Sequence, residues 1–304
     1  MRSIGIIHVL LFVFFAVIMS SCSSVQKGGN TDGSTIEKDL LLSKKNGLML
    51  FTVSDTDPQS KDILNNVFTD TLFSNISKEF MFYNIDIVKD EKLADTVQLE
   101  KNYVLFSDYN ITEVPYLCLM NKYGDIYHSA VVPQNIKTPS DFLTYLRGLK
   151  EKGKNVENLR EGLTAINGPD KTKAIKTFFD QIYLVDSEKY RSLFEDSINN
   201  DPQNESGLLG AFVIGRMQLN IEPLLKQKKY NEIIAELNNV LETKLLSPDE
   251  EQGVLCNIAY FSSYLPNIKA AHIIKYLEDA LKRAPDSFRA QSIKEDIEYL
   301  KSKN

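Results

Sequence analysis

The sequence contains no tryptophan and only three histidines and three cysteines among its 304 residues. His8 lies in an N-terminal apolar run, so only His128 and His272 remain for a site in the folded part of the protein. Zinc sites and serine-protease triads depend on histidine, and two distant histidines argue strongly against both. We therefore expect surface or packed structural histidines, no metal and no cofactor.

No two cysteines form a CxxC pair, so neither a dithiol redox centre nor a cysteine-rich metal site can be built locally. Cys118 and Cys256 each lie in an apolar stretch, YLCLM and VLC, and buried inert thiols are the usual outcome in such surroundings. A long-range disulfide between them stays open if the compartment is oxidising.

An excess of positive charge is also missing. The net charge is −6 and the basic residues are scattered, which predicts no nucleic-acid partner. With 43% hydrophobic and 25% charged residues the composition is that of a globular protein, and the length suits about two domains.

The N-terminal segment is organised as a secretory signal. Arg2 precedes an apolar run from Ile4 to Met19, which is shorter than the roughly 20 residues of a bilayer span. Cys22 then follows two serines and resembles the cysteine of a bacterial lipobox, although Met19 stands where leucine is usual. The resemblance implies cleavage before Cys22 and acylation of this residue. An uncleaved anchor or a plain secretion signal is the alternative.

Residues 23–35, SSVQKGGNTDGST, have the composition of a flexible tether. A lipid anchor needs such a spacer so that the folded part stands off the membrane. We predict a signal peptide over residues 1–21 and a tether over 22–35, which places the protein in the bacterial cell envelope, attached to a membrane through its N-terminal lipid.

Apolar runs alternate with helical spacing over residues 36–152 and predict an α/β domain. The expected strands are 48–53, 80–88, 116–120 and 126–132, and the expected helices are 36–45, 61–73, 94–107 and 140–151.

Two stretches of this domain resemble the thioredoxin fold. The first is FTVSDTDPQSK, residues 51–61, followed by Val67 and Phe68; the second is YNITEVPY, residues 109–116, followed by an Asn-Lys-x-Gly turn. The resemblance implies that Pro115 is a cis proline facing the active site. It also places the family's two cysteines at Asp57 and Ser60, and its tryptophan at Thr56.

The departure from the family decides the expected chemistry. Thioredoxin activity needs a thiolate at a helix N-terminus and a second thiol that resolves the mixed disulfide. Asp57 and Ser60 supply neither, so we expect no catalytic residue and no enzyme activity. Asp followed by Pro is a strong helix-start signal, which predicts that Asp57 caps a helix beginning at Pro58.

The sharper hypothesis is that the family's substrate groove remains as a docking surface. In redox-active relatives the backbone near the cis proline pairs with an extended peptide, and a non-catalytic version could hold a partner in the same way. The candidate residues, which we call the candidate site, are Thr56, Asp57, Pro58, Ser60, Val114 and Pro115.

Helical spacing dominates the second predicted domain, residues 153–304, with a break at Gly168-Pro169. Segments 190–202, 230–241 and 271–285 resemble the second helices of tetratricopeptide repeats, but segments 207–219 and 253–264 carry little of the first-helix signature. A non-repeating helical bundle is the alternative.

These observations favour a non-catalytic, membrane-tethered lipoprotein that binds envelope proteins or extended peptides as an adaptor or chaperone-like module. An atypical thiol-redox protein using Cys118 and Cys256 is the first alternative, and a structural lipoprotein without a specific ligand is the second.

Overall fold

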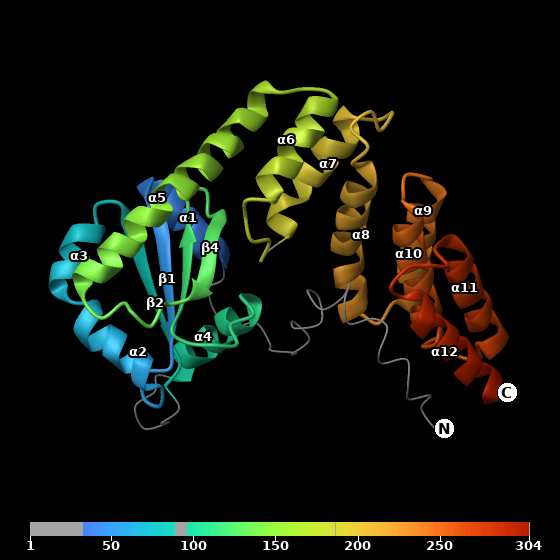
Figure 1. Cartoon of the computed structure of the whole chain (residues 1–304), viewed down its shortest axis with the longest axis horizontal. Coiled ribbons are helices and arrows are strands. Elements are labelled where there is room, and N and C mark those ends of the chain that lie inside the picture. The colour runs from blue at the N-terminus through green and yellow to red at the C-terminus, as the bar shows by residue number, and fades with distance from the viewer. Residues whose placement is uncertain (1–32, 89–95, 186, 304) are drawn as a thin grey trace. The chain divides into compact units, whose positions relative to one another are not determined.

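The computed structural model describes residues 33–88, 96–185 and 187–303 (Figure 1). Cys22, the predicted signal peptide and most of the predicted tether lie outside the described residues. The last three residues that we placed in the tether, 33–35, belong to helix α1 (Gly33–Ser43). None of the helices in the described ranges combines the length and apolar character that a bilayer crossing requires.

The described residues divide into two compact units. One contains residues 33–88, 96–166 and 174–185, and the other contains residues 167–173 and 187–303. Residue 152, where we placed the domain boundary, lies inside helix α5 (Pro139–Gly162). The polar segment 151–162 holds no proline, so helical hydrogen bonding continues through it, and the chain breaks instead at Gly168, which has a φ of 66°.

A four-stranded mixed sheet forms the centre of the first unit, with the order β2-β1-β3-β4. Strand β1 (Asn46–Thr52) is parallel to β2 (Phe80–Asp86) and antiparallel to β3 (Tyr116–Met120), which pairs with β4 (Ile126–Val131). All four predicted strands are confirmed. The apolar run of β1 places it in the middle of the sheet, where both of its faces are buried.

Helices cover both faces of this sheet. α1 and α4 (Thr96–Asp108) pack on one face, over a core of Ile36, Leu40, Met49, Phe51, Ile85, Leu105, Cys118, Met120 and Ile126. On the other face Phe142 of α5 meets Phe68 at a ring distance of 4.8 Å, and Phe68 stacks on Phe82 of β2 at 5.0 Å.

The single helix expected over residues 61–73 is wrong. The chain forms α2 (Pro58–Asp62), a π-helical turn (Ile63–Val67) and α3 (Asp70–Ile76). The helix begins at Pro58, as the Asp57-Pro58 signal predicts and three residues before the start given by the apolar spacing. It is interrupted where Phe68 enters the aromatic cluster and its N–H donates to the carbonyl of Ile63 at 3.0 Å. Helical spacing of apolar residues does not reveal such a break.

The chain returns to the sheet after α6 (Pro169–Phe179). Tyr183 forms an isolated bridge with Ile126 of β4, in which the Tyr183 N–H donates to the Ile126 carbonyl at 2.8 Å. Gly153 of α5 allows a close approach in the same region, because a Cβ there would lie 2.8 Å from Cζ of Tyr127. Residues 174–185 therefore belong to the first unit, which sequence spacing did not indicate.

The second unit is helical, as predicted. Its helices are α7 (Arg191–Asn200), α8 (Leu209–Lys226), α9 (Tyr230–Glu242), α10 (Pro248–Ser262), α11 (Ala270–Arg283) and α12 (Ala290–Ser302). From α7 onward each helix packs on the next one in the chain. Their apolar faces form one core, to which Val213, Met217, Ile233, Leu237, Ile258, Ile273, Leu277 and Ile293 contribute.

Candidate functional site

The loop after β1 is held in place by one carboxylate at the end of β2. Asp86 Oδ1 accepts hydrogen bonds from the Thr52 hydroxyl at 2.7 Å and from the Ser54 N–H at 2.9 Å, and Asp86 Oδ2 accepts one from the Ser54 hydroxyl. The Asn102 side chain of α4 in turn donates to the Asp86 carbonyl at 2.7 Å. Asp86 and Asn102 were not among the predicted residues, and they fix the path of the chain toward Asp57.

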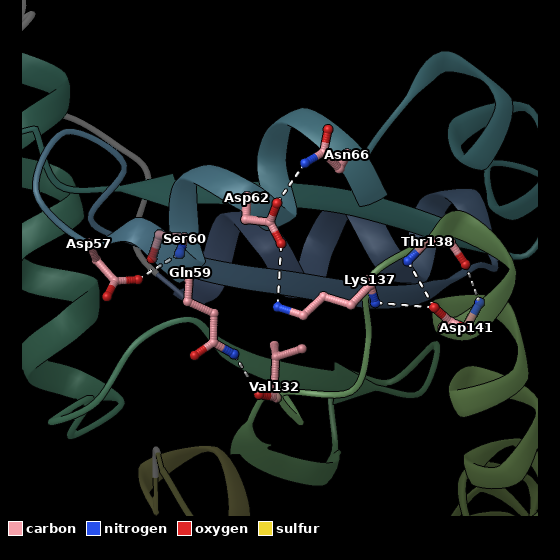
Figure 2. A network of polar contacts seen from close by, with 9 residues as sticks. All are labelled: Asp57, Gln59, Ser60, Asp62, Asn66, Val132, Lys137, Thr138 and Asp141. Atoms are coloured by element: carbon pink, nitrogen blue, oxygen red, sulfur yellow. Dashed lines mark hydrogen bonds and ion pairs between the residues drawn. The ribbon is translucent and has the colours of Figure 1, made fainter.

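Asp57 caps helix α2, as predicted. Its Oδ2 accepts the Ser60 N–H at 2.6 Å, its own backbone is extended, and Pro58 occupies the first turn (Figure 2). Such a cap stabilises a helix by about 0.5–2 kcal/mol relative to alanine. One oxygen of this carboxylate is therefore engaged by the helix backbone.

Ser60 is fully buried, and its hydroxyl accepts a hydrogen bond from the Val53 N–H at 3.2 Å. The hydroxyl thus joins α2 to the loop after β1. Asp55, Thr56 and Pro58 are exposed and Asp57 is half-buried, so all four residues contribute to the surface at this helix start.

The structure brings residues 51–61 and 109–116, the two stretches that resemble the thioredoxin fold, close together. The Val114–Pro115 bond is cis, Pro115 is buried, and its carbonyl accepts the Val132 N–H at 2.8 Å. The Val132 carbonyl accepts a hydrogen bond from the Gln59 side chain at 3.2 Å (Figure 2). A continuous chain of contacts therefore joins the start of α2 to Pro115 through Gln59, which sequence analysis did not single out.

Within the candidate site, Val114 has backbone groups that could form hydrogen bonds with a peptide. Its side chain is partly exposed, and within the described residues its N–H and its carbonyl take part in no backbone hydrogen bond. An extended peptide can form strand-like hydrogen bonds with an N–H and a carbonyl of this kind.

Charged side chains attach α2 to the start of α5. Asp62 accepts from the Asn66 amide at 2.5 Å and lies 3.5 Å from Lys137 Nζ (Figure 2). Lys137 and Thr138 precede α5, whose Asp141 forms a capping box with Thr138. The hydrogen bond from the Thr138 side chain, together with the backbone N–H groups of Lys137 and Thr138, lowers the pKa of Asp141.

Both described cysteines are free, and burial raises the pKa of each thiol to about 12. Cys118 is fully buried, with its sulfur 3.3 Å from the Ser129 hydroxyl. His128 is packed against Tyr145, whose hydroxyl lies 2.8 Å from Nε2, and burial lowers its pKa; His272 is exposed on α11. Across the described ranges no group of His, Cys, Asp and Glu side chains is placed to hold a metal ion.

Comparison with known proteins agrees with this geometry. Residues 37–164 match a family described as a thioredoxin-like domain. The N-terminal domain is thioredoxin-like. Residues 208–304 match a second family, described as an uncharacterised protein C-terminal domain, so the thioredoxin-like domain is followed by a separate all-helical region.

The chain is also similar to one curated protein and to one solved structure. An uncharacterized protein of Treponema pallidum (strain Nichols) is 22% identical over 282 residues, which cover 93% of this chain and 92% of the relative. A solved structure described as DsbH Oxidoreductase is 13% identical, covers 42% of this chain and 94% of its own, and superposes with a TM-score of 0.33.

Proposed function

We propose that the protein is a lipid-anchored, non-catalytic binding protein of the bacterial cell envelope, and that its thioredoxin-like domain holds an extended segment of a partner protein. The proposal depends mainly on the side chains at positions 57 and 60 and on their hydrogen bonds. The carboxylate of Asp57 caps α2, and the hydroxyl of Ser60 is buried and accepts from a backbone N–H. Neither group supports thiol exchange, while the free backbone of Val114 supports peptide pairing.

The alternative thiol-redox function finds little support in the two thiols. A thiolate is the reactive form of cysteine, and pKa values of about 12 leave both thiols protonated at neutral pH. Cys118 is also fully inaccessible. Alkylation in denaturant, with and without prior reduction, tests this alternative, which requires an additional labelled thiol after reduction.

The helical region suits a second contact surface. Consecutive packing of α7 to α12 favours the tetratricopeptide-like arrangement of helix pairs, whose arrays bind other proteins. Its exposed aromatic residue Tyr264 stacks on Tyr230 with a ring distance of 4.9 Å and donates to the Tyr260 hydroxyl at 2.7 Å. An adaptor with two binding domains is consistent with this arrangement.

The anchor is tested with Cys22→Ser in the native host. We expect metabolic labelling with a fatty acid to mark the wild-type chain and to be lost in the variant, which then leaves the membrane fraction. Equal labelling of both proteins would contradict acylation at Cys22.

Peptide binding is tested with a library of short unstructured peptides on purified chain. A bulky, charged Thr56→Arg substitution should abolish binding because Thr56 is exposed beside Asp57, whereas Ser74→Arg on the exposed face of α3 should not. Peptides methylated on their backbone nitrogens should bind more weakly than their parents, since strand-like pairing uses the N–H groups. Unchanged affinity in Thr56→Arg would contradict the proposed location.

A further inference from the structure

The end of the sheet opposite the candidate site carries a lysine-lined depression. Asn46 pairs with Phe80 and Gly47 pairs with Met120, so the first residues of β1 and β2 and the turn after β3 meet at this end. β1 has seven residues, which separates this end from the candidate site by roughly 20 Å. The depression has a volume of about 600 Å³, and Lys44, Lys78 and Lys122 line it.

The positive charge of this depression is only partly balanced. Lys122 is neutralised by Glu157 at 2.5 Å and by Glu161 at 2.9 Å. Lys44 and Lys78 are exposed, and within the described part of the chain neither forms an ion pair. Glu79 also lines the depression, but it pairs with Lys150 at 3.1 Å, so Lys44 and Lys78 are the two lining lysines without an ion pair among the described residues.

A hydrogen bond holds the two loops that carry these lysines against each other. Lys45 Nζ donates to the Ser77 carbonyl at 2.7 Å, which joins the loop between α1 and β1 to the loop between α3 and β2. The two unpaired lysines are therefore presented by a connected surface.

An exposed leucine lines the same depression, and a second one follows it in the chain. Leu41, which lines it, is 53% exposed, and Leu42 is 73% exposed at the last turn of α1. Leucine side chains beside unpaired lysines are the combination that peripheral proteins use at a bilayer surface: the apolar groups enter the interface and the lysines meet anionic lipid phosphates.

We propose that this end of the thioredoxin-like domain docks on an anionic lipid surface, with Leu41 and Leu42 in the interface and Lys44 and Lys78 against lipid phosphates. The proposal rests on the lipid anchor proposed above. Residues 23–32 separate Cys22 from α1 and reach at most about 35 Å when extended, about twice the ~16 Å length of α1. The tether is long enough for this end to reach the bilayer, and the candidate site then faces away from the membrane.

The test uses the full chain, purified from membranes and reconstituted into vesicles of phosphatidylcholine alone or mixed with phosphatidylglycerol. A fluorophore sensitive to its environment is attached through Leu42→Cys in a Cys256→Ala background, in which the other described cysteine, Cys118, is fully buried. We expect its emission to shift to shorter wavelength in the mixed vesicles and not in pure phosphatidylcholine. In Lys44→Glu/Lys78→Glu the shift should disappear, because two lysines near the surface contribute on the order of fivefold each to docking.

A matched control changes the charge equally elsewhere. Lys61 lies on α2 beside the candidate site and Lys275 on α11, both exposed, so Lys61→Glu/Lys275→Glu should keep the shift. Loss of the shift in this control, or its persistence in Lys44→Glu/Lys78→Glu, would overturn the proposal.

Further outcomes distinguish lipid docking from binding of a small anion and from attachment through the lipid anchor alone. A shift of equal size with soluble glycerol phosphate and no vesicles would overturn lipid docking in favour of a small-anion site. Flotation of the chain with the vesicles but no shift would overturn the docking and leave the anchor intact. Failure to float would contradict the anchor itself and, with it, this proposal.

Discussion

Replacement of Asp57 tests the structural role of the residue at the centre of the candidate site. Asp57→Ala removes the acceptor that lies 2.6 Å from the Ser60 N–H, while Pro58 and the buried Ser60 hydroxyl remain. Loss of a cap of this kind costs about 1 kcal/mol. With a urea dependence of about 2 kcal/mol/M, the unfolding midpoint should fall by roughly 0.5 M.

The assay must report on the thioredoxin-like domain alone, since two units can unfold in separate transitions. Cys118 offers such a reporter, because it is fully buried when the domain is folded. In a Cys256→Ala background, the fraction of Cys118 that reacts with a thiol reagent at each urea concentration measures the unfolding of this domain.

Asp57→Asn is the matched control, because asparagine caps helices about as well as aspartate. We expect its midpoint to stay close to that of the wild type. An Asp57→Ala midpoint equal to the wild-type value would refute the capping role. Equal losses in both variants would show that the charge, and not the hydrogen bond, stabilises α2.

Three further predictions concern packing, ionisation and chemistry. Gly153→Ala should destabilise the protein by about 1–3 kcal/mol, because the added Cβ would lie 2.8 Å from Tyr127 Cζ. In the same helix, the Cβ of Gly148→Ala meets nothing within 4 Å, so this variant should stabilise the protein. Urea unfolding compares the two variants, and equal effects would contradict the contact at Gly153. Asp296 has a buried oxygen without a hydrogen-bond partner among the described residues, and burial raises its pKa from 3.8 to about 6, so the protein loses stability as the pH rises through this range. Asp296→Asn should therefore stabilise the protein by about 1 kcal/mol at pH 7.5, after allowance for the partial exposure of the side chain, and by less at pH 5. A gain that does not grow with pH would contradict the pKa shift. Asp57→Cys should trap partners that carry a disulfide, because its thiolate attacks the disulfide, releases one partner thiol and leaves a mixed disulfide that Ser60 cannot resolve. Asp57→Cys/Ser60→Cys should release these partners with their two thiols reduced and a disulfide between positions 57 and 60. Non-reducing gels of native envelopes distinguish the two variants, and identical adducts would contradict the assignment of positions 57 and 60.

Local signals predicted much of the fold. Each strand is a short run of apolar and β-branched or aromatic residues, and the start of α2 follows from Asp57 and Pro58, whose preferences act within one turn. The cis bond at Pro115 was expected only from the resemblance to a family, since no local rule requires it.

Contacts between distant segments escaped prediction. Asp86 reaches Ser54 only because β1 and β2 are parallel and in register, and Gln59 reaches Val132 only because β3 and β4 bring that carbonyl to the start of α2. Spacing within a segment carries no information on such pairs. The same holds for Tyr183, which joins β4 through backbone groups that every residue possesses.

The most direct test of the proposed function places a photo-crosslinking residue at Thr56 in the native envelope, with separate variants at Tyr264 and at Glu298, an exposed control on α12. We predict a discrete adduct with a partner protein at Thr56 and none at Glu298. Adducts at Tyr264 alone would contradict peptide binding by the thioredoxin-like domain and would assign recognition to the helical region.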